Sequence, residues 1–239
     1  MSWTDLFTHF NRLDLAALLL LFGSWAFIGL LIDNAPKSWP SVSGLMAQYR
    51  REWMVEMITR DPRIFDAHIL GTLRQGTSFL ASATLIAIGG SLALLGDLDQ
   101  VIGIAGDLTP GQEPLVVWEV KILVILLFLA NAFLKFVWSN RLFGYCAVLM
   151  AAVPNDASDP RALIRARKAG EINITAARGF NRGLRSLYFA LATAAWILGS
   201  EALLLATAVT ILLLLRREFA SQSRAVLMQP DTGDSHTQS

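Results

Sequence analysis

The chain has 239 residues, of which 54% are hydrophobic and 16% are charged. This composition is too apolar for an ordinary soluble domain of this length, so we predict an integral membrane protein. A formal net charge of +1 gives no argument for nucleic-acid binding. The single cysteine, Cys146, excludes an intramolecular disulfide framework and a multi-cysteine metal site, and we expect it to be a small packing residue.

The chain begins with an amphipathic segment and a first apolar run. Trp3, Phe7 and Phe10 lie at helical spacing, which suits a membrane interface. The run over residues 15–32 is long enough to cross a bilayer, and no small-residue cleavage pattern follows it. We therefore predict an uncleaved first span.

An amphipathic helix is predicted from Ser43. Its apolar side chains recur at intervals of three and four residues: Met46, Tyr49, Trp53 and Met57. Charged residues occupy its remaining faces: Arg50, Arg51, Glu52 and Glu56. We expect this helix to pack on the bundle or to lie among lipid headgroups.

The next helix is predicted to start with Asp61 as its N-cap and Pro62 at its first position. Arg63 and Asp66 are three residues apart, so they can pair on one face. The apolar part over 77–95 is the second predicted span, and its small residues permit close helix approach in lipid.

The segment over 96–114 contains no Lys or Arg and is predicted to be an external loop. Its acidic residues do not follow EF-hand spacing, so we expect no calcium site. The third span, 115–137, is bracketed by Trp118 and Trp138, as an aromatic belt would be.

Four polar residues fall within the third span. Near its two ends lie three charged residues, for which we expect side chains that reach the interface: Glu119, Lys121 and Lys135. Asn131 remains inside the span. Its predicted role is an interhelical hydrogen bond.

A fourth helix is predicted to start at Asp159 and Pro160, and it continues into two apolar runs over 184–198 and 202–215. One helix across both runs would be about 45 Å long and would place Glu201 near the lipid midplane. We therefore predict two short spans with a tight turn at Gly199. The polar tail over 220–239 is predicted to be disordered and cytoplasmic.

The charge distribution favours five spans. Six Lys or Arg residues lie over 33–76, eight over 138–185 and three after residue 215, whereas 96–118 has none. With five spans all the basic regions lie inside, whereas four spans would put the arginines of the tail outside. We predict an all-α polytopic transmembrane helix bundle, one domain over 1–219, with helices extended into the cytoplasm. It belongs in a bacterial inner membrane, with the N-terminus outside and the C-terminus in the cytoplasm.

Motifs along most of the chain resemble a family of bacterial and plant multi-span membrane proteins known under a domain-of-unknown-function label. The first motif comprises Arg51, Trp53, Met54, Arg60, Arg63 and Asp66. Others are Trp118-Glu119-Val120-Lys121 and Phe180-Asn181-Arg182-Gly183-Leu184-Arg185. Where relatives often have Gly-Pro in the hairpin, this chain has Gly199-Ser200, which weakens the turn signal. The resemblance implies no substrate or reaction.

The sequence carries no recognisable catalytic or cofactor-binding motif. Nucleotide, dinucleotide, zinc-protease and serine-hydrolase patterns are absent, and the three histidines lie in different regions. We therefore expect no metal, no cofactor and no catalytic residue. An enzyme acting on a lipid would use Asp66 with His68, but these residues are two apart on a helix and point to different faces.

Arginines of the inner regions are the candidate ligand-binding groups. If the helices extend below the bilayer, eight side chains can converge on an anion or lipid headgroup: Arg51, Arg60, Arg63, Asp66, Arg141, Asn181, Arg182 and Arg185. The competing interpretation is that these arginines only fix orientation. The predicted function is binding or movement of an anionic lipid or small anion. The alternative is a structural or assembly subunit of a larger membrane complex. Expected partners are membrane lipids, with other membrane proteins or a second copy under the alternative, and no nucleic acid.

Overall fold

The computed structural model describes residues 10–98, 102–103 and 114–230. Within these ranges the chain is helical and contains no strand, which confirms the predicted all-α fold. The helices are α2 (Arg12–Asp33), α3 (Val42–Glu56), α4 (Ile64–Gly96), α6 (Leu115–Ala151), α7 (Pro160–Ala194), α8 (Ser200–Phe219) and α9 (Gln222–Leu227). Short 3-10 segments, η1 (Met57–Thr59) and η2 (Ala195–Leu198), follow α3 and α7.

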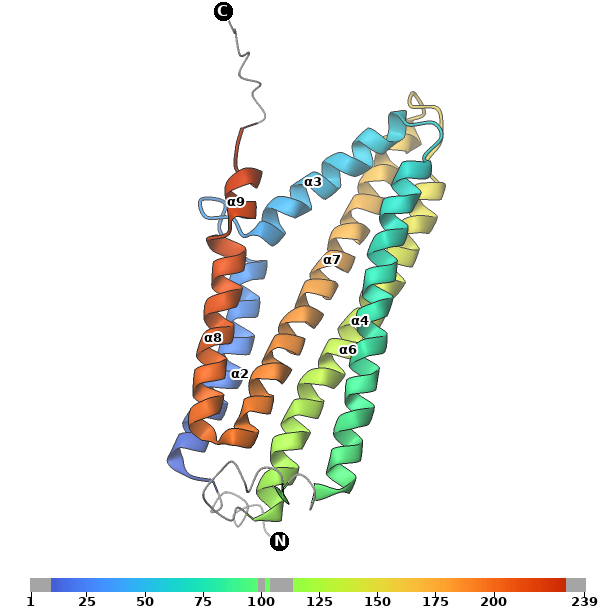
Figure 1. Cartoon of the computed structure of the whole chain (residues 1–239). Coiled ribbons are helices and arrows are strands. Elements are labelled where there is room, and N and C mark those ends of the chain that lie inside the picture. The colour runs from blue at the N-terminus through green and yellow to red at the C-terminus, as the bar shows by residue number, and fades with distance from the viewer. Residues whose placement is uncertain (1–9, 99–101, 104–113, 231–239) are drawn as a thin grey trace, which may run out of the picture.

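The long helices run along the molecule and α3 lies across one end of them (Figure 1). The helices α2, α4 and α6 are each long and apolar enough to cross a membrane. The pair formed by α7 and α8 runs alongside them, and its turn lies at the end opposite α3 (Figure 1). The predicted Trp3 and Phe7 interface segment and most of the predicted external loop lie outside the described residues.

The predicted break at Gly199 is confirmed. Gly199 has a φ of +117° and separates η2 from α8. Only glycine adopts this conformation without strain from a β-carbon, so one residue can reverse the chain direction. The turn forms with Ser200 directly after Gly199.

The two predicted helix starts have different outcomes. Asp159 caps α7 with Pro160 in the first turn, as predicted. Hydrogen bonds from the Arg161 side chain and backbone N–H hold the pKa of Asp159 at about 2. The predicted start at Asp61 is wrong, because α4 begins at Ile64 and its N-cap position is occupied by Arg63 without a side-chain cap. The Arg63 side chain donates instead to the backbone oxygens of Val153 and Pro154. This tertiary contact fixes the residue at which α4 begins.

The short helix α9 falls within the tail for which the sequence predicts no structure. Ser221 caps it by accepting a hydrogen bond from the backbone N–H of Arg224. The Arg224 side chain donates to the backbone oxygen of Pro40 at 2.9 Å. This contact attaches α9 to the segment before α3.

The predicted apolar face of α3 is only partly buried. Met57 is buried and Trp53 packs against the same core cluster, as the spacing predicts. Met46 and Tyr49 are instead 37% and 36% exposed.

The α3 helix lies against α7. A β-carbon added at Gly170 of α7 would be at an ordinary contact distance, 3.6 Å from Met54 Cγ. Arg50 turns toward α7, where it donates to the amide oxygen of Asn173.

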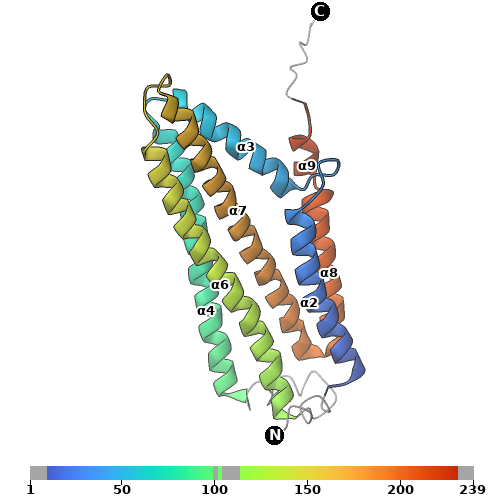
Figure 2. The ribbon, with the colours of Figure 1, turned by 180° about the vertical axis from the view of Figure 1, so that it is seen from behind.

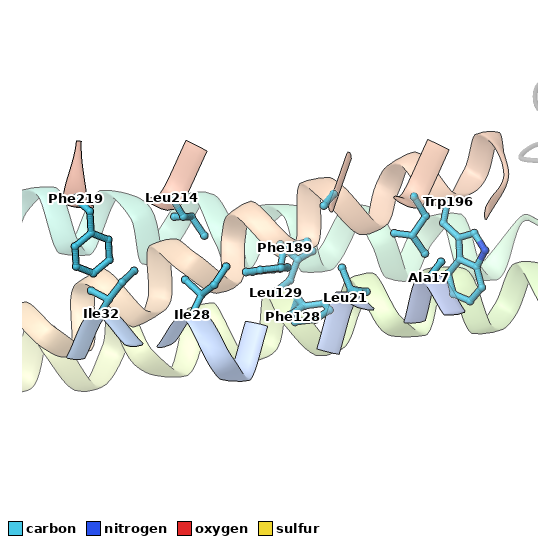
Figure 3. Packing of buried hydrophobic residues seen from close by; sticks show 13 residues of the cluster. Ala17, Leu21, Ile28, Ile32, Phe128, Leu129, Phe189, Trp196, Leu214 and Phe219 are labelled. Atoms are coloured by element: carbon cyan, nitrogen blue, oxygen red, sulfur yellow. The ribbon is translucent and has the colours of Figure 1, made fainter. Parts of the chain in front are cut away.

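The core between α2, α6, α7 and α8 is apolar and interdigitated. Along α2, side chains at intervals of four and seven residues are buried: Ala17, Leu21, Ile28 and Ile32. They point toward aromatic and leucine side chains of the neighbouring helices (Figure 3). Phe128 stacks on Phe22 and Phe189, which ties α6 to α2 and α7.

The polar residues of the third predicted span behave in two ways. Asn131 donates to Ser186 Oγ at 2.6 Å, so the expected interhelical hydrogen bond is confirmed. The interface position expected for Lys121 is wrong, because its side chain is only 1% exposed and its ammonium lies 4.5 Å from the Trp118 ring. Trp118 is itself 4% exposed and belongs to the core rather than to a surface aromatic belt. Cys146 is buried, consistent with a packing role.

Candidate anion-binding groove

The eight predicted ligand-binding residues do not converge on one site. Asp66 is fully buried, where it accepts a hydrogen bond from Trp53 Nε1 at 2.7 Å and pairs with Arg60. Arg63 does not pair with Asp66. Its guanidinium donates to the backbone oxygens of Val153 and Pro154, each at 2.7 Å. These residues therefore join α3, α4 and the turn after α6. Arg63 Nε and Asp66 Oδ2 are buried without a hydrogen-bond partner in the described part of the chain.

Two further predicted residues make surface contacts. Arg51 of α3 pairs with Glu171 of α7 at 2.6 Å, and both side chains are more than half exposed. Arg141 bonds to Tyr145 Oη one turn further along α6 and lies over its ring. Neither residue borders the groove described below.

Arg182 and Arg185 do come together, on α7 opposite the end of α2. Arg182 Nε lies 2.8 Å from Asp33 Oδ2, and Arg185 Nη2 lies 3.1 Å from Asp33 Oδ1. Their three-residue spacing puts both guanidinium groups on one side of α7. Asp33 ends α2, where the helix dipole disfavours a carboxylate, so two cations compensate an otherwise unfavourable charge.

This ion cluster borders a groove of about 450 Å³ between α2, α6 and α7, three helices visible together in Figure 2. Polar groups line it from each helix: Trp25, Asp33, Asn131, Lys135, Arg182, Arg185 and Ser186. Ser186 Oγ accepts from Asn131 and from Trp25 Nε1, at 2.6 and 3.3 Å, which fixes the deep part of the groove. Ala26, Gly29 and Leu30 supply an apolar wall.

The groove carries more positive than negative charge. Lys135, Arg182 and Arg185 face one carboxylate, Asp33, which leaves a surplus of two positive charges. Among the described residues, no acidic group pairs with Lys135. Arg185 is 3% exposed, and its Nη1 is buried without a hydrogen-bond partner in the described part of the chain. A buried charged donor without an acceptor is costly, so an anion here would be favourable.

Sequence reasoning missed part of this groove. The sequence analysis interprets Lys135 and Asn131 one at a time and gives Asp33 no role. Basic side chains at the ends of two predicted spans, 115–137 and 184–198, and an acidic residue directly after the predicted span 15–32 were the available signal. Asn181 was predicted with its neighbours but faces elsewhere, where its Nδ2 donates to Ser43 Oγ at 3.2 Å.

The sequence model of a family described as proteins of unknown function, DUF599, matches residues 16–223. The chain belongs to the DUF599 family. This confirms the predicted family resemblance, and the matched part of the DUF599 chain contains every residue of the groove. No curated protein and no solved structure matches this DUF599 chain.

Proposed function

We propose that this DUF599 protein is a multi-span protein of the bacterial inner membrane that binds the phosphate of an anionic lipid in the groove between α2, α6 and α7. The observation that carries the proposal is the surplus of two positive charges in a groove that also has an apolar wall. Arginine forks and a lysine ammonium suit phosphate oxygens, and the apolar wall suits the upper part of an acyl chain.

The proposed orientation places the α3 end in the cytoplasm. Asp33, at that end of α2, and the connections on either side of α3 belong to the basic regions of the chain. The connection at the opposite end, between α4 and α6, contains no Lys or Arg. Positive residues concentrate on the cytoplasmic side of membrane proteins, where anionic lipid headgroups also attract them. The groove would then open at the level of the inner leaflet.

The test is native mass spectrometry of the protein extracted with its own lipids. The double variant Lys135→Gln, Arg182→Gln removes two positive charges from the groove while Asp33 keeps Arg185 as a partner. We expect wild type to retain an anionic phospholipid and the variant to lose it, with a roughly tenfold or greater weakening when short-chain phosphatidylglycerol is added back.

A matched control is Arg167→Gln, Lys168→Gln, which removes two exposed charges from α7 outside the groove. We expect this variant to keep the lipid. Equal lipid retention by wild type and both variants would contradict the proposed groove and leave the arginines as orientation signals.

A structural or assembly role is the second candidate, and the surface of α4 favours it. In the described chain the packing of α4 is mainly against α6. A β-carbon added at Gly71, Gly76, Gly89 or Gly90 would meet nothing within 4 Å. Small residues exposed to lipid are typical of a surface on which another transmembrane helix docks closely.

If α4 docks on a partner, substitutions on its exposed surface should abolish assembly and leave the stability of the protein unchanged. The Gly76→Leu, Gly89→Leu variant should fold with unchanged or slightly higher thermal stability, because leucine is the better helix former. If α4 docks on a partner, association seen after extraction in mild detergent should be lost in that variant. Wild type that is monomeric and free of partners under the same conditions would argue against an assembly role.

A further inference from the structure

A second cavity of about 340 Å³ lies beneath α3, between α7 and α8. Figure 1 shows α3 crossing above these two helices. No described residue lines both this cavity and the groove between α2, α6 and α7. The cavity and the groove are therefore two separate sites.

Three arginines line this cavity, from three different segments: Arg50 of α3, Arg178 of α7 and Arg217 of α8. The only carboxylate in the lining is Glu218, which is 3% exposed. It accepts hydrogen bonds from Ser43 N and Ser43 Oγ, at 3.1 and 2.9 Å, and so holds the first turn of α3. The lining therefore carries a surplus of two positive charges.

The three guanidinium groups are incompletely neutralised. Arg50 donates to the amide oxygen of Asn173, which is uncharged, and burial lowers the pKa of this guanidinium without removing its charge. Arg217 makes two long polar contacts, 3.3 Å to Tyr188 Oη and 3.4 Å to Glu218 Oε1, and its guanidinium lies over the Tyr188 ring, 5.6 Å from the ring centroid. Within the described residues, Arg178 has no acidic partner. Arg178 is exposed and the Arg217 side chain is 39% exposed, so both guanidinium groups are accessible to an anion.

Much of the remaining lining is apolar, and it comes from four helices: Met46, Leu73, Phe143, Ile174, Phe180 and Leu184. Hydroxyl and amide groups also line the cavity: Ser43, Asn181, Ser221 and Ser223. A lining that combines cationic and apolar groups fits a molecule with an anionic head and an apolar chain.

We propose that this cavity binds a phosphate monoester carried on an apolar chain. A phosphate monoester has a charge of about −1.5 to −2 near neutral pH, which matches the two unneutralised positive charges. A phosphate diester has only one negative charge. Arginine forks bind the terminal phosphate oxygens in pairs, and a monoester presents three such oxygens. Because much of the lining is apolar, a phosphate on an apolar chain should bind more tightly than free phosphate.

The experiment compares three probes on purified, delipidated protein by native mass spectrometry: short-chain phosphatidic acid, short-chain phosphatidylglycerol and inorganic phosphate. The variant Arg178→Gln, Arg217→Gln removes the two arginines that make no strong contact within the protein. We expect wild type to bind phosphatidic acid more tightly than phosphatidylglycerol. In the variant phosphatidic acid should bind about tenfold or more weakly, as when a hydrogen bond to a charged group is lost.

A second variant, Ala177→Phe, fills the apolar part of the cavity and leaves every charge in place. It should lose phosphatidic acid but not the response to inorganic phosphate, if wild type has one. The control Arg167→Gln, Lys168→Gln should behave as wild type. The groove variant Lys135→Gln, Arg182→Gln should also keep phosphatidic acid, so failure of the groove proposal can be told apart from failure of this one.

Three results would overturn the inference. Equal binding of phosphatidic acid and phosphatidylglycerol by wild type would show that no monoester is selected. Unchanged phosphatidic acid binding in both cavity variants would place the lipid elsewhere. Displacement of phosphatidic acid by inorganic phosphate, combined with insensitivity to Ala177→Phe, would retain the arginine site and assign it to a soluble phosphate.

Discussion

Replacing Gly183 by alanine is expected to lower the free energy of unfolding by about 1–3 kcal/mol, the usual cost of overpacking a close-packed core. A β-carbon at this position would lie 2.7 Å from Phe136 Cε1 and 2.9 Å from Cδ1. The Phe136 ring is fully buried and contacts Phe180, so it has no space into which to move. The helices α6 and α7 would have to separate.

The control for this prediction is Gly144→Ala in α6, where a β-carbon would meet nothing within 4 Å. Because alanine is the better helix former, this change should stabilise the protein by roughly 0.5–1 kcal/mol. Thermal unfolding in one detergent should thus shift in opposite directions for the two variants, by about 2–4 °C per kcal/mol. A Gly183→Ala midpoint equal to or above that of wild type would contradict the packing of Gly183 against Phe136.

The fold was largely predictable from the sequence, because its main signals are local. Long apolar runs, the Asp159 and Pro160 start and the Gly199 break each depend on a few neighbouring residues. The start of α4 was not predictable in this way. Its position depends on Arg63 reaching the carbonyl groups of Val153 and Pro154, about ninety residues away in sequence.

The candidate sites were less predictable for the same reason. The sequence shows that arginines gather in the inner regions, but not which carboxylate or carbonyl each one meets. Arg60 and Arg63 bond to groups within the protein, whereas Arg50, predicted on one of the remaining faces of its helix, lines a cavity. The burial of Lys121 was missed because one of the two rings beside its ammonium, Trp196, is distant in sequence, although the other, Trp118, lies on the same helix. Whether a charged side chain bonds within the protein, is buried in the core or is available to a ligand depends on its partners on other helices.

The ion cluster of the groove gives the other large expected effect. Asp33→Ala should lower the free energy of unfolding by about 3–5 kcal/mol, because it leaves Arg185 buried without its counter-charge. The Arg185 side chain is 4% exposed and that of Asp33 is 12% exposed, so water screens this pair weakly. The matched control is Glu171→Ala, which breaks the exposed pair with Arg51 and should cost at most about 1 kcal/mol. Chemical unfolding in mixed micelles measures both changes, and equal effects of the two variants would contradict the buried ion pair.

A second substitution of Asp33 tests its effect on stability and its effect on lipid binding in one experiment. Asp33→Asn keeps the size of the side chain but raises the surplus positive charge of the groove from two to three, since only the three cations remain. If the groove holds a lipid phosphate, this variant should unfold more readily when delipidated and yet bind phosphatidylglycerol more tightly than wild type. Added lipid should then restore a larger share of its stability, because a ligand that binds only the folded state stabilises it in proportion to its affinity. If the cluster has only a structural role, Asp33→Asn should lower the stability of the protein and leave its affinity for phosphatidylglycerol unchanged. A titration with phosphatidylglycerol therefore distinguishes the two roles of Asp33.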